Sequence, residues 1–89
     1  MNNATRKKIV KLIYRIEKVK DELGDIQSEI QDISGDEQEK LDNMGNFEGT
    51  ERYAAISGAV DALDEADDKF SDATDALDEI IESLEEACS

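Results

Sequence analysis

The residues of this chain that could do chemistry are carboxylates, and they are concentrated in its second half. Position a of a heptad repeat there holds Ile56, Leu63, Phe70, Leu77 and Leu84. In the same numbering, all eight c and f positions between Asp61 and Glu86 are acidic. Like charges four residues apart on a helix repel by about 0.2–0.5 kcal/mol per pair. A helix that needed only solubility would mix in lysines, so the acidic stripe indicates a basic partner.

The spacing of these carboxylates is close to that of a nucleic-acid backbone. Twelve of them lie between Asp61 and Glu86, one per about 3 Å at a rise of about 1.5 Å per residue. A DNA strand carries one phosphate per about 3.4 Å, so a rigid helix of this kind could occupy a nucleic-acid groove. The alternative is a solvated surface without a partner. The residues predicted to contact the partner are Asp61, Asp64, Glu65, Asp68, Asp72, Asp75, Glu79 and Glu82, reinforced near the turn by Glu22, Asp25, Glu29 and Asp32.

No catalytic or metal site is predicted. Histidine is absent, which removes the commonest general base and metal ligand. The carboxylates are regularly spaced on a solvated face, whereas an acid–base pair needs a dry cleft. A calcium loop starting at Asp32 would have Glu37 where glycine is required, and one starting at Asp42 would have Phe47 there. We therefore expect a non-enzymatic protein with no cofactor.

Composition narrows the class of protein. The 89 residues make a single domain, and a formal charge of −14 predicts repulsion from nucleic acid and from anionic membranes. High charge with few aromatic residues also occurs in disordered chains, but the apolar residues here are periodic, which indicates a folded one. The N-terminal segment has no continuous apolar core, unlike a signal peptide or membrane span, and the single cysteine, Cys88, forms no internal disulfide. A cytoplasmic location is the expectation.

The apolar pattern predicts an all-α, antiparallel two-helix hairpin within residues 1–89. Helix 1 spans about 4–33, capped by Asn3 or Thr5; residues 34–50 form a short helix and turn; helix 2 spans about 51–87, capped by Thr50. Ser34-Gly35 either kinks or ends helix 1, and the turn itself is Gly45–Gly49. The apolar residues of helix 1 keep a period of 3.5, which is typical of coiled coils and bundles; they are Ile9, Leu12, Ile16, Val19, Leu23, Ile26, Ile30 and Ile33.

A hairpin alone buries little apolar surface, so we expect a homodimer that forms a four-helix bundle. The predicted oligomer interface is Val10, Ile13, Tyr14, Leu63, Phe70 and Leu77. Residues 1–20 hold seven Lys or Arg against one acid. This basic segment is expected to neutralise helix 2, and a DNA-contacting arm is the alternative.

The segments DEQEKLDNM, GTERYAAISGAVDALDEA and ALDEIIESLEEA resemble small acidic helical proteins of phages and prophages of Gram-positive, clostridia-like bacteria. The resemblance covers residues 36–87 and implies a phage setting, with the host cytoplasm as its location. The resemblance assigns no functional residues to this chain. Small acidic phage proteins include inhibitors of nucleic-acid-binding defences, such as anti-CRISPR proteins. An inhibitory function is expected of this chain only by analogy with them.

Three functions are therefore open. The first is an inhibitor that binds a basic nucleic-acid-handling protein, such as a CRISPR effector nuclease, by nucleic-acid mimicry. The second is a self-assembling structural bundle with a solvated acidic surface. The third is DNA contact by the basic N-terminal segment, for which we expect no binding of plain duplex.

Overall fold

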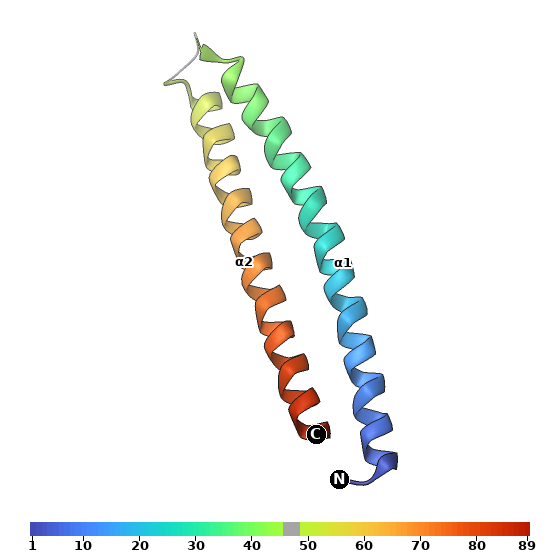
Figure 1. Cartoon of the computed structure of the whole chain (residues 1–89). Coiled ribbons are helices and arrows are strands. Elements are labelled where there is room, and N and C mark those ends of the chain that lie inside the picture. The colour runs from blue at the N-terminus through green and yellow to red at the C-terminus, as the bar shows by residue number, and fades with distance from the viewer. Residues whose placement is uncertain (46–48) are drawn as a thin grey trace.

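The computed structural model confirms an antiparallel hairpin of two long helices (Figure 1). Helix α1 spans Asn3–Asp42 and helix α2 spans Glu51–Cys88. The structure describes residues 1–45 and 49–89, so Asn46, Phe47 and Glu48 of the predicted turn lie outside the described residues. The molecule is a thin rod measuring 68 × 16 × 13 Å. Both chain termini lie at the end opposite the turn.

Side-chain caps fix where each helix begins. The Asn2 Oδ1 atom accepts a hydrogen bond from the Thr5 backbone N–H at 2.8 Å, so the cap of α1 is Asn2, one residue before the earlier of its two predicted caps. The predicted cap of α2 is confirmed, because Thr50 Oγ1 accepts from the Tyr53 N–H at 3.2 Å. Gly49, which precedes this cap, has a φ of 92°, a conformation that glycine adopts without steric cost.

Helix α1 continues beyond its predicted end near residue 33. Ser34 and Gly35 are helical, and so is most of the segment predicted as a separate short helix. Contacts with α2 explain the difference, because Ser34 Oγ donates to Asp64 Oδ1 at 3.0 Å and Leu41 is 8% exposed. These contacts offset the weakening of about 1 kcal/mol that glycine brings to a helix interior.

The two helices pack through heptad positions a and e. With Ile9 at position a of α1 and Ile56 at position a of α2, every a and e position from 9 to 41 and from 53 to 88 is buried or half-buried. The most buried residues, Leu41, Val60 and Ile81, all occupy position e. A heptad repeat normally packs through a and d. Here position d is left outside the seam, with Leu12 44%, Val19 48% and Ile80 47% exposed.

Polar contacts at the seam set the register of the hairpin. Gln27 Nε2 donates to Asp67 Oδ1 at 2.9 Å and to Ser71 Oγ at 3.1 Å, and Gln31 Nε2 donates to Asp67 Oδ1 at 2.8 Å. Lys20 pairs with Asp78 nearer the termini. The hydrogen bond to Asp78 raises the pKa of Lys20 above its ordinary value of 10.5.

Candidate protein-binding surfaces

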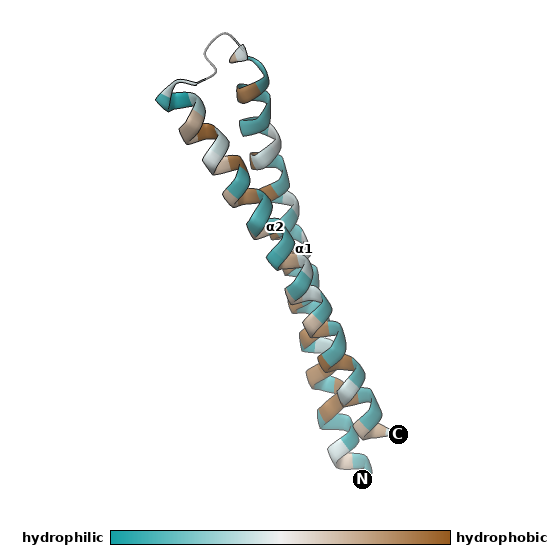
Figure 2. Cartoon of the chain, turned by 90° about the vertical axis from the view of Figure 1, so that its left-hand side faces the viewer, coloured by the Kyte–Doolittle hydropathy of each residue, from teal (hydrophilic) through white to brown (hydrophobic). Residues whose placement is uncertain are grey.

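The acidic surface predicted from the sequence lies on the outside of the rod. All twelve carboxylates predicted to contact a partner are exposed, eight of them on α2 and four on α1. Within the described part of the chain, Asp64 is the one of them that bridges the helices, through its hydrogen bond from Ser34. Hydrophilic and hydrophobic residues alternate along both helices in Figure 2.

Few of these carboxylates have a basic neighbour. Among residues 1–45 and 49–89, the ion pairs are Lys20–Asp78, Lys40–Glu37 at 2.7 Å and Lys69–Glu65 at 3.2 Å. Glu65 is therefore the only one of the twelve predicted residues in an ion pair within the described structure. The rest of the predicted surface carries negative charge that the fold itself leaves unneutralised.

The basic N-terminal segment neutralises α2 at one point. Lys20 is the residue of this segment that forms an ion pair with α2. Lys18 instead lies with its Nζ atom 4.6 Å from the centroid of the Tyr14 ring, a cation–π contact on the outer side of α1. Exposed Arg6, Lys7 and Lys8 extend the basic segment toward the terminus.

A second surface was missed from the sequence, and we call it the apolar d face. It consists of the apolar d positions of both helices, which are Leu12, Val19, Ile26, Ile33, Ala59, Ala66, Ala73, Ile80 and Ala87. Ala66 is half-buried and the others are exposed. Because the helices are antiparallel, the same flank of each helix lies on the same side of the hairpin. The two d rows therefore belong to one face.

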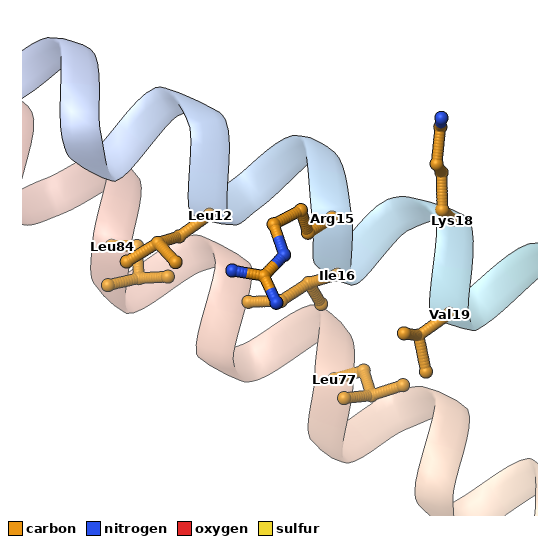
Figure 3. A pocket seen from close by; sticks show the side chains of 7 residues that line it. All are labelled: Leu12, Arg15, Ile16, Lys18, Val19, Leu77 and Leu84. Carbon is orange, nitrogen blue, oxygen red and sulfur yellow. The ribbon is translucent and has the colours of Figure 1, made fainter.

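The apolar d face has a groove near the termini. Its lining residues are Leu12, Arg15, Ile16, Lys18, Val19, Leu77 and Leu84. Figure 3 shows Leu12, Ile16 and Val19 of α1 facing Leu77 and Leu84 of α2, while Lys18 points away from the groove. A second hollow further along is lined by Leu23, Ala66, Lys69, Phe70 and Ala73. Both hollows continue the same face.

The six residues predicted as an oligomer interface do not form one surface. Ile13 lies in the seam between the helices, at position e. Val10 and Tyr14 are 59% and 58% exposed and line a shallow hollow on α1 alone. Leu63, Phe70 and Leu77 occupy position a, where they are half-buried. Phe70 and Leu77 also border the apolar d face.

The described residues, 1–45 and 49–89, include neither a metal-ligand cluster nor a membrane-spanning helix. No three of their His, Cys, Asp or Glu side chains are grouped so as to hold a metal ion. Neither described helix is long and apolar enough to cross a membrane. Comparison with protein-family models, curated proteins and solved structures found no match to this chain.

Proposed function

We propose that this chain is a non-enzymatic binding protein that presents its acidic outer surface to a basic, nucleic-acid-handling protein. The observation that carries the proposal is the row of eight exposed carboxylates predicted on α2, of which the described structure pairs only Glu65. Repulsion along this row weakens the helix, and a basic groove would relieve it. The bound rod would exclude nucleic acid from that groove by its volume and its charge.

The target class follows from the same chemistry. A groove that binds a phosphate backbone is lined with Lys and Arg, and it would attract a rod with similarly spaced negative charges. In the phage setting that the sequence resemblance implies, a host nuclease such as a CRISPR effector is the kind of protein to test. Association should be fast at low salt and much slower at high salt.

The test compares two charge-reversed variants. The first carries Asp68→Lys, Asp72→Lys and Asp75→Lys on the predicted surface of α2. The matched control carries Asp21→Lys, Glu39→Lys and Asp42→Lys, which are exposed positions of α1 outside the predicted set and change the net charge equally. Circular dichroism of both variants checks that the helices remain.

Each variant is immobilised and used to capture proteins from a host lysate at about 50 and 500 mM salt. We expect the wild type and the control to retain a basic nuclease or polymerase at low salt, and a DNA duplex to compete for it. The α2 variant should retain none. Equal capture by all three proteins would contradict the proposal.

Self-assembly is the second candidate function, and the apolar d face is the observation that favours it. If it were the sole function, the carboxylates of α2 would be replaceable. Substitutions at the d positions would then abolish self-assembly, whereas the charge reversal on α2 would leave self-assembly intact.

A further inference from the structure

We infer that the apolar d face is covered by a second copy of this chain, in a four-helix bundle with the turns of the two hairpins at opposite ends. In that bundle α1 packs against the α1 of the partner, and α2 packs against the partner's α2. The inference does not rest on the acidic surface binding a basic protein.

The hairpin leaves part of each heptad without a packing partner. Each helix of a four-helix bundle points positions a and d at the centre and uses e for one neighbouring helix and g for the other. In this hairpin positions a and e are already buried or half-buried, with e making the most buried contacts. Positions d and g stay outside. The hairpin therefore has half of a bundle's contacts, and the missing half lies on one face.

The exposed surface area of the chain is large for its mass. The chain exposes 6573 Å², whereas a compact monomer of 9.9 kDa is expected to expose about 5,200 Å². The difference of about 1,400 Å² is larger than the roughly 800 Å² that each partner buries in a standard interface. A second hairpin on the apolar d face would remove surface of this order.

The charges at position g of α1 favour a second copy of this chain as the partner on the apolar d face. On α1 this row reads, from the N-terminus, Lys8, Arg15, Glu22, Glu29 and Asp36. The sign reverses along the helix, so an antiparallel copy of the same row is complementary to it at both ends, while Glu22 at the centre meets its own copy. Lys8 then lies by the partner's Asp36, and Arg15 lies by the partner's Glu29. Opposite charges at such flanking positions are what set helix pairing and orientation in coiled coils.

Position g of α2 has a different character that fits the same arrangement. This row reads Ala55, Ala62, Lys69, Ala76 and Ser83. Small side chains at both d and g allow two α2 helices to approach closely. Within the rows that would meet the partner's α2, Lys69 is the only charge.

The two helices agree on where the two-fold axis crosses. The g row of α1 reverses sign about Glu22, and the g row of α2 has Lys69 and Ser83 at equal spacing on either side of Ala76. The contacts of Lys20 with Asp78 and of Gln27 with Ser71 place Glu22 level with the stretch of α2 that contains Ala76. One axis therefore serves both helix pairs.

The other closed arrangement places both turns at the same end and packs α1 against the partner's α2. It would lay the charged g row of α1 over the alanines of α2. The charge pattern thus disfavours it.

Cys88 provides a direct test, because it is the chain's only cysteine. Nitroxide labels on Cys88 of the two copies should be about 35 Å apart in the inferred bundle, since each label is some twelve residues from the axis at about 1.5 Å per residue. With turns at the same end they would be within about 20 Å, given interaxial distances of 8–10 Å. A double electron–electron resonance measurement separates the two. A short distance, or the mass of one chain in sedimentation, would overturn the inference.

A charge swap tests the pairing without touching the apolar residues or the carboxylates of α2. Arg15→Glu places a carboxylate beside the partner's Glu29 at two symmetric sites, and we expect the dimer dissociation constant to rise by about tenfold or more. Adding Glu29→Arg in the same chain should restore association. The control Lys11→Glu changes the net charge equally at an outward c position and should have little effect. Failure of the double variant to recover would refute the α1 pairing.

Discussion

At the scale of single residues, neighbouring carboxylates of α2 have opposite roles. Asp67 is half-buried at position e, where its Oδ1 accepts hydrogen bonds from Gln27 at 2.9 Å and from Gln31 at 2.8 Å. Asp68, the next residue, is exposed on the acidic surface. The sequence shows two adjacent aspartates in one acidic stripe. Only the position of α1 distinguishes the one that holds the hairpin together from the one that is free to bind a partner.

This difference predicts different effects on stability. Asp67→Ala removes the acceptor of two amide groups, and we expect a loss of about 1–3 kcal/mol in the free energy of unfolding. Asp68→Ala removes a like-charge neighbour and should leave the stability unchanged or raise it by a few tenths of a kcal/mol. Urea unfolding followed by circular dichroism measures both. Equal effects of the two substitutions would contradict the assigned roles.

At the scale of the elements, tertiary contact overrides a local helix-ending signal. Gly35 lies in the interior of α1, and a Cβ atom added there would meet nothing within 4 Å. Gly49 also has free space but a φ of 92°. Gly35→Ala should therefore stabilise the protein by about 0.5–1 kcal/mol, through its helix propensity.

Gly49→Ala is the matched comparison. It should destabilise the protein by about 1 kcal/mol or more, because alanine is strained at positive φ. Thermal unfolding of the two variants at one protein concentration gives the comparison. A loss of stability in Gly35→Ala would mean that the helix does not run straight through residue 35.

The helices themselves could be predicted from the sequence, but not the rows through which they pack. Local signals such as Thr50 and the apolar period identify an all-α hairpin, because each depends on nearby residues. The seam contains Lys20, Gln27 and Ser34 at position e. Polar side chains of this kind are expected to be exposed to solvent. They are half-buried here because Asp78, Asp67 and Asp64 of α2 lie opposite them. The a and d positions of a heptad repeat identify the residues at the centre of a bundle. They do not indicate whether the e row or the g row packs against the other helix of the hairpin.

The candidate surfaces were predictable to different degrees for the same reason. A carboxylate at c or f points outward in either packing, so residues such as Asp72 and Glu79 are exposed as expected. The apolar d face, in contrast, depends on which rows the hairpin uses. Leu12 and Val19 look like core residues in the sequence, and their exposure appears only once α2 is in place.

At the scale of the whole molecule, the acidic residues of α2 and the apolar d face are separate and compatible, whereas Glu22 and Glu29 of α1 lie at position g and would face the partner copy. In the inferred bundle the c and f positions still point outward, while d and g are covered. The α2 helices of the two copies lie side by side, so their carboxylates form one surface twice as wide as that of a single chain. The mixed charges of α1 lie on the other side. Self-association would thus concentrate the charge that the proposed basic partner recognises.

Separation of the two surfaces predicts how stability depends on concentration. If folding is completed by association, each tenfold rise in protein concentration should stabilise the folded dimer by about 1.4 kcal/mol, because unfolding releases two chains. The unfolding midpoint of the wild type should therefore rise with concentration. The variant with lysine at 68, 72 and 75 should keep this dependence, since its changes lie at outward c and f positions. Arg15→Glu should shift the rise to higher concentrations while leaving the α2 carboxylates in place. A midpoint independent of concentration in the wild type would show that the hairpin is stable alone, and that the apolar d face is free for a partner other than itself.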